Sequence, residues 1–224
     1  MEKNLKNIVI VGGGIVGISS ALCLIRRGCK VTIIEKELNG ESASYGNASW
    51  LSSLSITPVL MPGAIFNIPK MLFSKDGPLF LKFPEIIRII PWLLKYLSYS
   101  SVDKVNYISD HLAPLLSNSF EEHKKLAEGT DALKWIANSP FLFIYKNRKD
   151  YIMEALTWNI RKKHGFKPIE IEKDELLALV PGLSEEYTFA IKIDNQGYIS
   201  NSKKYLSDLI EGFKKLGGKI IEDE

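Results

Sequence analysis

The chain has 224 residues, of which 46% are hydrophobic and 25% are charged. This composition is typical of a folded globular protein and argues against a disordered or fibrous chain. With 29 Lys and Arg against 26 Asp and Glu, the formal net charge is only +3, so nucleic acid is not an expected partner.

The N-terminal region carries a nucleotide-binding pattern. A short apolar run over residues 8–11 leads directly into Gly12-Gly13-Gly14-Ile15-Val16-Gly17. Helical spacing follows as far as Gly28, and a second apolar run over residues 31–34 ends at Glu35. A strand, a glycine turn, a helix, a strand and an acid, in a unit of about thirty residues, form the context that the dinucleotide fingerprint requires.

Each residue type in this pattern has a physical role. Gly12 allows a sharp turn out of the first strand, Gly14 lets the backbone approach a pyrophosphate, and Gly17 allows close packing of helix on strand. The positive end of the helix then faces the phosphates. The carboxylate of Glu35 is placed to accept hydrogen bonds from ribose hydroxyls, and it disfavours the 2′-phosphate of NADP.

The fingerprint alone does not separate FAD from NAD. Residues 40–49 read Gly-Glu-Ser-Ala-Ser-Tyr-Gly-Asn-Ala-Ser, a polar stretch of small residues directly after the acid. Such a stretch is suited to wrapping a pyrophosphate or approaching an isoalloxazine ring. The alternative is a solvated polar loop, because loops are commonly rich in these residues.

Residues 8–49 resemble the FAD-dependent oxidoreductases of the D-amino-acid oxidase superfamily, and most of all the small subunit of bacterial D-amino-acid dehydrogenase. Ser44, Asn47 and Ala48 match the family's Ser-x-x-Asn-Ala, whereas Ser49 stands where the family usually has Gly. The resemblance implies FAD as the cofactor, bound by Gly12, Gly13, Gly14, Ile15, Val16, Gly17, Glu35, Lys36, Ser44, Asn47, Ala48 and Ser49. Tyr45 and Asn47 are expected to lie nearest the flavin. No catalytic residue is assigned.

The resemblance also implies oxidative deamination of a D-amino acid, with hydride transfer from the substrate α-carbon to flavin N5. Two alternatives stay open. One is an oxidase of the same superfamily that acts on glycine, sarcosine or another N-methyl amino acid. The other is a non-catalytic FAD- or NAD-binding subunit that completes a partner chain. Oxygen and a quinone or dye are both open as the electron acceptor.

Beyond residue 49 the pattern predicts irregular structure with short helices over residues 50–82, and then a series of regular elements. We expect helices over residues 84–99 (kinked or divided at Pro91), 107–128 (interrupted at Pro114), 148–164, 175–180 and 201–216. We expect strands over residues 141–145, 169–171, 188–193 and 219–222.

These elements predict an α/β fold, with a Rossmann-like FAD-binding domain and part of an α+β substrate or cap domain. The expected domain ranges are residues 1–50, an insertion over residues 51–193, and a return to the first domain over residues 194–224. Relatives are expected to continue for roughly as many residues again, as the resemblance implies. We therefore expect an N-terminal part of the enzyme, either truncated or paired with a C-terminal partner chain.

The helix over residues 86–97 has two interpretations. Trp92, Tyr96 and Tyr99 flank its apolar face, as in a helix at a bilayer surface, so peripheral membrane or quinone contact is one of them. A buried helix of the cap domain is the favoured one, because apolar stripes at helical spacing are mostly core.

Other features predict a cytoplasmic protein without a metal site. No run reaches the roughly 18 apolar residues of a spanning helix, and no signal peptide precedes the first strand. Cys23 and Cys29 lack metal-ligand spacing and are expected to be buried or half-buried thiols. The histidines are expected to be ordinary helix-surface or core residues, and the cationic run over residues 161–164 a solvated helix end.

Overall fold

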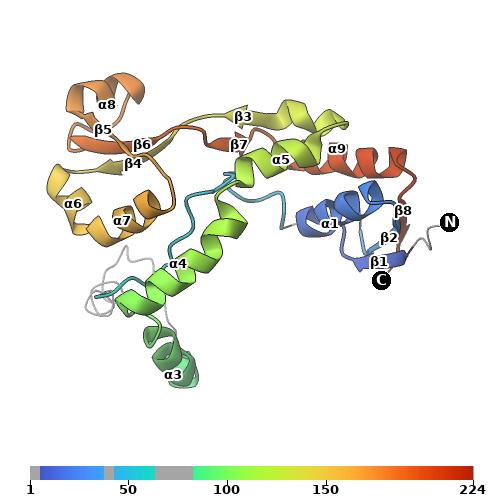
Figure 1. Ribbon diagram of the computed structural model, residues 1–224, viewed down its shortest axis with the longest axis horizontal. Helices are drawn as coiled ribbons and strands as arrows, with labels where there is room; N and C mark the ends of the chain where they lie inside the picture. Colours follow the sequence, from blue (N-terminus) through green and yellow to red (C-terminus); the bar gives the residue numbers. More distant parts are fainter. Residues whose placement is uncertain (1–5, 38–42, 64–82, 224) are drawn as a thin grey trace. The chain divides into compact units, whose positions relative to one another are not determined.

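The computed structural model describes residues 6–37, 43–63 and 83–223 (Figure 1). The chain divides into two compact units. Unit 1 combines Met1–Ser52, Asn118–Phe141 and Asp194–Glu224, and unit 2 combines Ser53–Ser117 and Leu142–Ile193. Residues 118–141 thus group with unit 1, whereas the sequence suggested one continuous insertion over residues 51–193. The functional division into domains stays a prediction.

Unit 1 is built on a parallel three-stranded sheet in the order β1-β2-β8. Its strands are β1 (Asn7–Val11), β2 (Lys30–Glu35) and β8 (Lys219–Glu222). Ile10 lies opposite Ile33, and Ile33 lies opposite Ile220. The expected strand–helix–strand unit and the expected α/β fold are therefore confirmed.

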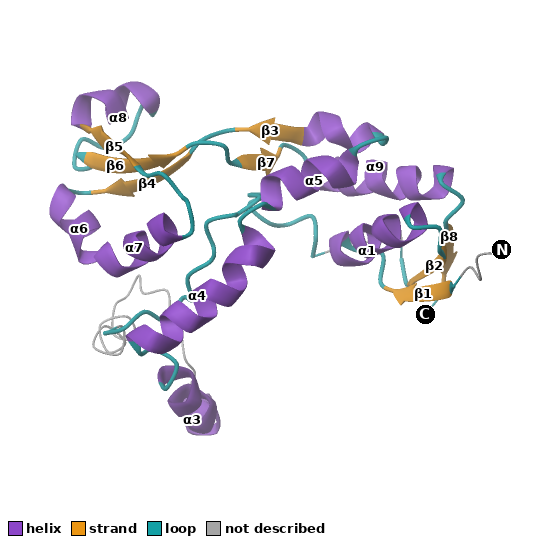
Figure 2. Cartoon of the chain, in the orientation of Figure 1, coloured by secondary structure: helices purple, strands orange, loops and turns teal. Residues whose placement is uncertain are grey.

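Helix α1 (Ile15–Arg26) packs against this sheet, and α9 (Ser202–Lys215) packs against α1, as Figure 2 shows. Alternate residues of the strands point toward these helices, so Ile33 is fully buried while Val11 is 85% exposed. The core also contains the fully buried side chains of Leu22 and Phe213. Burial of each such large side chain contributes about 1.5–3 kcal/mol.

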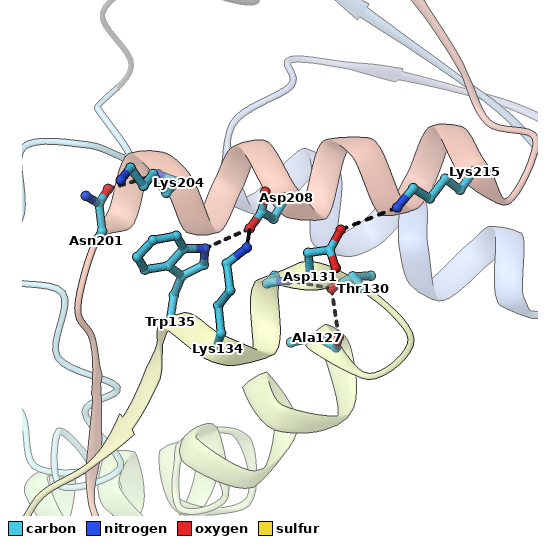
Figure 3. A network of polar contacts seen from close by, with 10 residues as sticks. Ala127, Thr130, Asp131, Lys134, Trp135, Asn201, Lys204, Asp208 and Lys215 are labelled. Atoms are coloured by element: carbon cyan, nitrogen blue, oxygen red, sulfur yellow. Dashed lines mark hydrogen bonds and ion pairs between the residues drawn. The ribbon is translucent and has the colours of Figure 1, made fainter.

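The segment over residues 118–141 packs beside α9 within unit 1 (Figure 3). It comprises α5 (Ser119–Ala127), a 3-10 helix η2 (Asp131–Trp135), and β3 (Ile136–Asn138), which pairs antiparallel with β7 (Gly197–Ile199). The carboxylate of Asp208 accepts a hydrogen bond from Trp135 Nε1 at 2.8 Å and binds Lys134 Nζ at 3.0 Å. Burial acts to raise the pKa of Asp208, but these two donors hold it below its ordinary value.

Unit 2 contains a three-stranded sheet in the order β4-β6-β5. Its strands are β4 (Phe141–Tyr145), β5 (Ile169–Glu172) and β6 (Phe189–Ile193), and β5 and β6 are antiparallel. Its helices are α3 (Phe83–Leu97), α4 (Val102–Leu116), α6 (Arg148–Met153), α7 (Ala155–Lys163) and α8 (Lys173–Leu179). The strands predicted over residues 141–145, 169–171, 188–193 and 219–222 agree with β4, β5, β6 and β8 to within a few residues. The helix predicted over residues 201–216 agrees equally well with α9.

Two helix predictions were wrong in detail. The break expected at Pro114 lies after Leu116, because a proline in the last turn removes one donor without ending the helix. The single helix expected over residues 148–164 is divided at Glu154, which ends α6 and begins α7. The Glu154 carboxylate accepts a hydrogen bond from the Tyr145 hydroxyl at 2.8 Å. The residue at the helix break therefore also connects the helices to the end of β4.

Three expectations about burial were also wrong. Arg161, expected in a solvated helix end, is only 8% exposed, and its guanidinium packs against the rings of both Phe143 and Trp158. Cys23 is exposed, because it lies on the face of α1 away from the core. None of residues 87–97 of α3 is buried, so its apolar stripe is not core. Among the described residues, no helix is long and apolar enough to cross a membrane.

Candidate functional site

The glycine turn after β1 has the tight geometry that its sequence predicts. Gly12 has φ +98°, a left-handed conformation that favours glycine, and its N–H donates to the carbonyl of Ile34 at 2.8 Å. A Cβ added at Gly17 would lie 1.9 Å from the Gly12 carbonyl oxygen. The first turn of α1 can therefore pack against the turn only because residue 17 has no side chain.

The N-terminus of α1 presents backbone donors at the end of this turn. Gly14 is the N-cap residue, and the first helical hydrogen bond runs from the Ile18 N–H to the Gly14 carbonyl at 3.0 Å. The N–H groups of residues 15–17 precede that ladder and have no acceptor within the helix. Together with the helix dipole they make this end of α1 suited to an anion.

Glu35 lies beside the same turn. It is the last residue of β2, and its Oε2 accepts a hydrogen bond from the Gly13 N–H. A Cβ added at Gly13 would lie 3.2 Å from that oxygen, which is tighter than ordinary van der Waals contact. The acid and the turn therefore meet at the carboxyl ends of two parallel strands, which is where nucleotides bind in open α/β sheets.

The polar loop that follows is folded back onto the start of α1. The Ser44 hydroxyl accepts a hydrogen bond from the Ile15 N–H at 3.1 Å. The Asn47 side chain shapes the loop, with Oδ1 accepting from the Ser49 N–H at 2.8 Å and Nδ2 donating to the Ser44 carbonyl at 3.0 Å. The loop is thus ordered by its own side chains.

Ser49 adopts the conformation of a glycine. Its φ is +57°, and its hydroxyl is hydrogen-bonded to that of Ser202 at the start of α9. The place where the resembling family usually has Gly is therefore a left-handed position, which explains that preference.

A cavity of about 150 Å³ lies between this loop and the helices of unit 1. It brings together four of the predicted site residues and several that the sequence did not indicate: Ile15, Ser44, Asn47, Ser49, Trp50, Leu51, His123, Ile199, Ser202, Tyr205 and Leu206. The glycines at 12–14 and the acidic end of β2 are not part of its wall. The predicted site residues therefore form two neighbouring groups, one at the turn and one at the cavity.

His123 and Tyr205 are the notable additions. His123 Nδ1 lies 2.9 Å from the Tyr205 hydroxyl, and burial lowers the pKa of His123 and raises that of Tyr205. The two residues lie on α5 and α9, 82 positions apart, and no sequence pattern links them. Tyr45, expected near the flavin, has Lys203 Nζ 5.6 Å from its ring centre. Among the described residues, no cluster of His, Cys, Asp or Glu is arranged to hold a metal ion.

Curated relatives match the chain along most of its length. It is 32% identical over 219 residues to D-amino-acid oxidase of Bradyrhizobium diazoefficiens, covering 96% of this chain and 52% of that protein. It is 30% identical over 146 residues to D-amino acid dehydrogenase of Helicobacter pylori, covering 62% of this chain and 34% of that protein. The chain thus spans about half the length of the first relative, or less for the second.

Solved structures support the fold. Glycine oxidase from Bacillus cereus is 19% identical with a TM-score of 0.54, and the match covers 98% of this chain and 46% of that one. L-α-glycerophosphate oxidase from Mycoplasma pneumoniae, solved with FAD bound, is 16% identical with a TM-score of 0.55, covering 97% of this chain and 44% of that one.

A family model described as DAO, FAD dependent oxidoreductase, matches residues 7–224. This match confirms the resemblance stated from residues 8–49, and FAD is the cofactor of the matched family. The chain belongs to the DAO family of FAD-dependent oxidoreductases.

Proposed function

We propose that this chain binds FAD at the glycine turn and forms the nucleotide-binding part of an enzyme that oxidises a D-amino acid. The observation that carries the proposal is the contact between Glu35 and the Gly13 N–H beside the N-terminus of α1. An acid, a glycine turn and a helix N-terminus at one edge of a parallel sheet suit the ribose and pyrophosphate of a dinucleotide. These residues therefore fit FAD.

Each part of the site has a proposed role. The N–H groups of residues 16 and 17, at the start of α1, donate to the pyrophosphate, and Glu35 accepts from the adenosine ribose hydroxyls. Lys36 adds a positive charge next to the acid. The loop from Ser44 to Ser49, with Asn47 and Ala48, covers the pyrophosphate on its other side. When bound, FAD accepts the hydride that leaves the substrate α-carbon.

The substrate class is proposed from the relatives, which are named D-amino-acid oxidase and D-amino acid dehydrogenase. The remaining length of such a protein would come from further sequence or from a partner chain. The complete protein should oxidise D-alanine and not L-alanine, as measured by dye reduction and by oxygen consumption in parallel. Turnover of glycine or sarcosine with no turnover of any D-amino acid would favour the amine-oxidase alternative and contradict this proposal.

A peripheral contact with a lipid surface is proposed for α3. Ile87, Trp92 and Leu94 are exposed on this helix, and Trp92 stacks on Tyr96 with ring centres 5.0 Å apart. An exposed apolar helix with an aromatic pair is suited to the interfacial region of a bilayer. Trp92→Glu should abolish flotation with phosphatidylglycerol vesicles. Met153→Glu, which changes an exposed methionine of α6, should not. Equal flotation of both variants would contradict the contact.

A further inference from the structure

The cavity of unit 1 has a mainly apolar lining with two polar side chains that the proposed nucleotide contacts do not use. His123 on α5 and Tyr205 on α9 line this cavity together with Ser44 of the loop and Ile15 at the start of α1. His123 Nδ1 and the Tyr205 hydroxyl are 2.9 Å apart. The pair therefore lines the same half-open cavity as the loop that is proposed to cover the pyrophosphate.

The burial of Tyr205 determines which nitrogen of His123 carries the proton. Tyr205 is only 2% exposed and its hydroxyl hydrogen needs an acceptor, so we infer that it donates to Nδ1 of His123, which lies at hydrogen-bond distance. A nitrogen that accepts carries no proton, so the neutral ring carries its proton on Nε2. Burial favours the neutral ring, because it lowers the pKa of His123. The imidazole thus offers one N–H donor, at Nε2.

The surroundings of this donor suit an oxygen acceptor of modest size. The wall combines hydroxyl groups of Ser44 and Ser202 with the apolar side chains of Leu51 and Leu206. A volume of about 150 Å³ exceeds the roughly 10–15 Å³ that one water needs, so a group of several atoms can enter. Partial exclusion of water strengthens a hydrogen bond made there.

We propose that His123 is a cofactor-binding residue whose Nε2–H donates to an oxygen of the pyrophosphate–ribityl linker of FAD. Tyr205 is a positioning residue that fixes the ring and its tautomer. This inference rests on the proposed function and adds to it a contact from α5, a helix outside the glycine fingerprint and outside the loop that follows it.

Two substitutions at position 123 separate the two ring nitrogens. His123→Gln keeps an amide donor near the place of Nε2, whereas His123→Asn keeps a polar atom near the place of Nδ1 and removes the donor. His111→Asn is the matched control, because His111 is an exposed histidine on α4 of unit 2. FAD affinity is measured by quenching of flavin fluorescence on titration into the apo form of the complete protein, with the melting temperature of each apo-protein measured alongside.

We expect His123→Asn to weaken FAD binding at least tenfold, His123→Gln to stay within about threefold, and His111→Asn to leave affinity unchanged. Wild-type affinity in His123→Asn, with an unchanged apo melting temperature, would overturn the role of His123 and leave the proposed function intact. Absence of FAD binding by the wild-type protein would instead overturn the proposed function, and this inference with it.

A measurement on the unmutated protein covers the case in which a variant fails to fold. Imidazole ¹⁵N shifts of the apo-protein should show a proton on Nε2 of His123, and the Nε2 resonance should move when FAD is added. A proton on Nδ1, or an Nε2 resonance that does not move at saturating FAD, would overturn the inference.

Discussion

Oε2 of Glu35 accepts a hydrogen bond from the backbone N–H of Gly13, so the last residue of β2 is held against the turn that follows β1. This contact links the two sequence signals of the nucleotide site, the glycines and the acid, through one pair of atoms. A ribose bound by Glu35 would share this carboxylate with the turn. Removal of the carboxylate should therefore affect both the shape of the turn and the affinity for the cofactor.

Gly17→Ala should destabilise unit 1 and abolish FAD binding. The added Cβ would lie 1.9 Å from the Gly12 carbonyl oxygen, a backbone atom that cannot move without opening the turn. Overpacking of this kind costs about 1–3 kcal/mol. Chemical denaturation measures the change, and Gly46→Ala is the control, since a Cβ there meets nothing within 4 Å. Equal losses in the two variants would contradict the packing role of Gly17.

Ser49→Gly and Ser49→Ala should differ in stability. The left-handed conformation costs a non-glycine residue about 1–2 kcal/mol, which glycine avoids. Both variants lose the hydrogen bond to Ser202, about 0.5–1.5 kcal/mol. Ser49→Gly should therefore stay close to wild type, while Ser49→Ala, like Ser202→Ala, should lower the free energy of unfolding. Lower stability of Ser49→Gly than of Ser49→Ala would contradict the strain at this position.

Arg161→Met should leave the stability of unit 2 within about 1 kcal/mol of wild type. In the described part of the chain, Nε and Nη1 of Arg161 have no hydrogen-bond partner, and each such donor costs about 1–3 kcal/mol. The contacts of the guanidinium with Phe143 and Trp158 offset this by a similar amount. Arg161→Ala should instead cost about 2–5 kcal/mol, because it leaves a cavity. A loss as large in the methionine variant would show that the charge itself stabilises the unit.

The pH dependence of stability should contain a contribution from His123. Burial lowers the pKa of the folded-state histidine below the value of about 6.5 in the unfolded chain. Below about pH 6.5 the unfolded state therefore binds a proton that the folded state resists, and the free energy of unfolding falls as the pH falls. Denaturation of His123→Leu between about pH 7.5 and 5.5 should show a shallower decline than wild type or His111→Leu. Parallel curves would contradict this contribution.

The βαβ unit could be predicted from the sequence because its signals are local and agree with one another. The two apolar runs, the helical spacing and Glu35 all point to the same element order. Other features depend on contacts that are distant in sequence. The short pair of β3 and β7 has only three residues in each strand, too few to show a period.

As with the fold, the sequence could indicate only those parts of the candidate site that have local signals. Ile15, Ser44, Asn47 and Ser49 line one cavity, while their role in binding FAD stays a prediction. His123 and Tyr205 were missed because their meeting depends on how α5 packs beside α9. The burial of Arg161 was missed for a related reason, since a charge at a helix end usually faces water, whereas this guanidinium packs against the rings of Phe143 and Trp158.

Titration of FAD into the apo-protein and its Glu35→Ala variant tests the central claim most directly. Loss of a hydrogen bond to a charged carboxylate costs about 1.5–3 kcal/mol, so affinity should fall by roughly 10- to 100-fold. Glu37→Ala, two residues beyond and exposed, should bind FAD as wild type does. The account predicts flavin uptake by wild type, a clear loss in Glu35→Ala, and no comparable binding of NADH. Unchanged FAD affinity in Glu35→Ala, or tight NADH binding without flavin uptake, would contradict it.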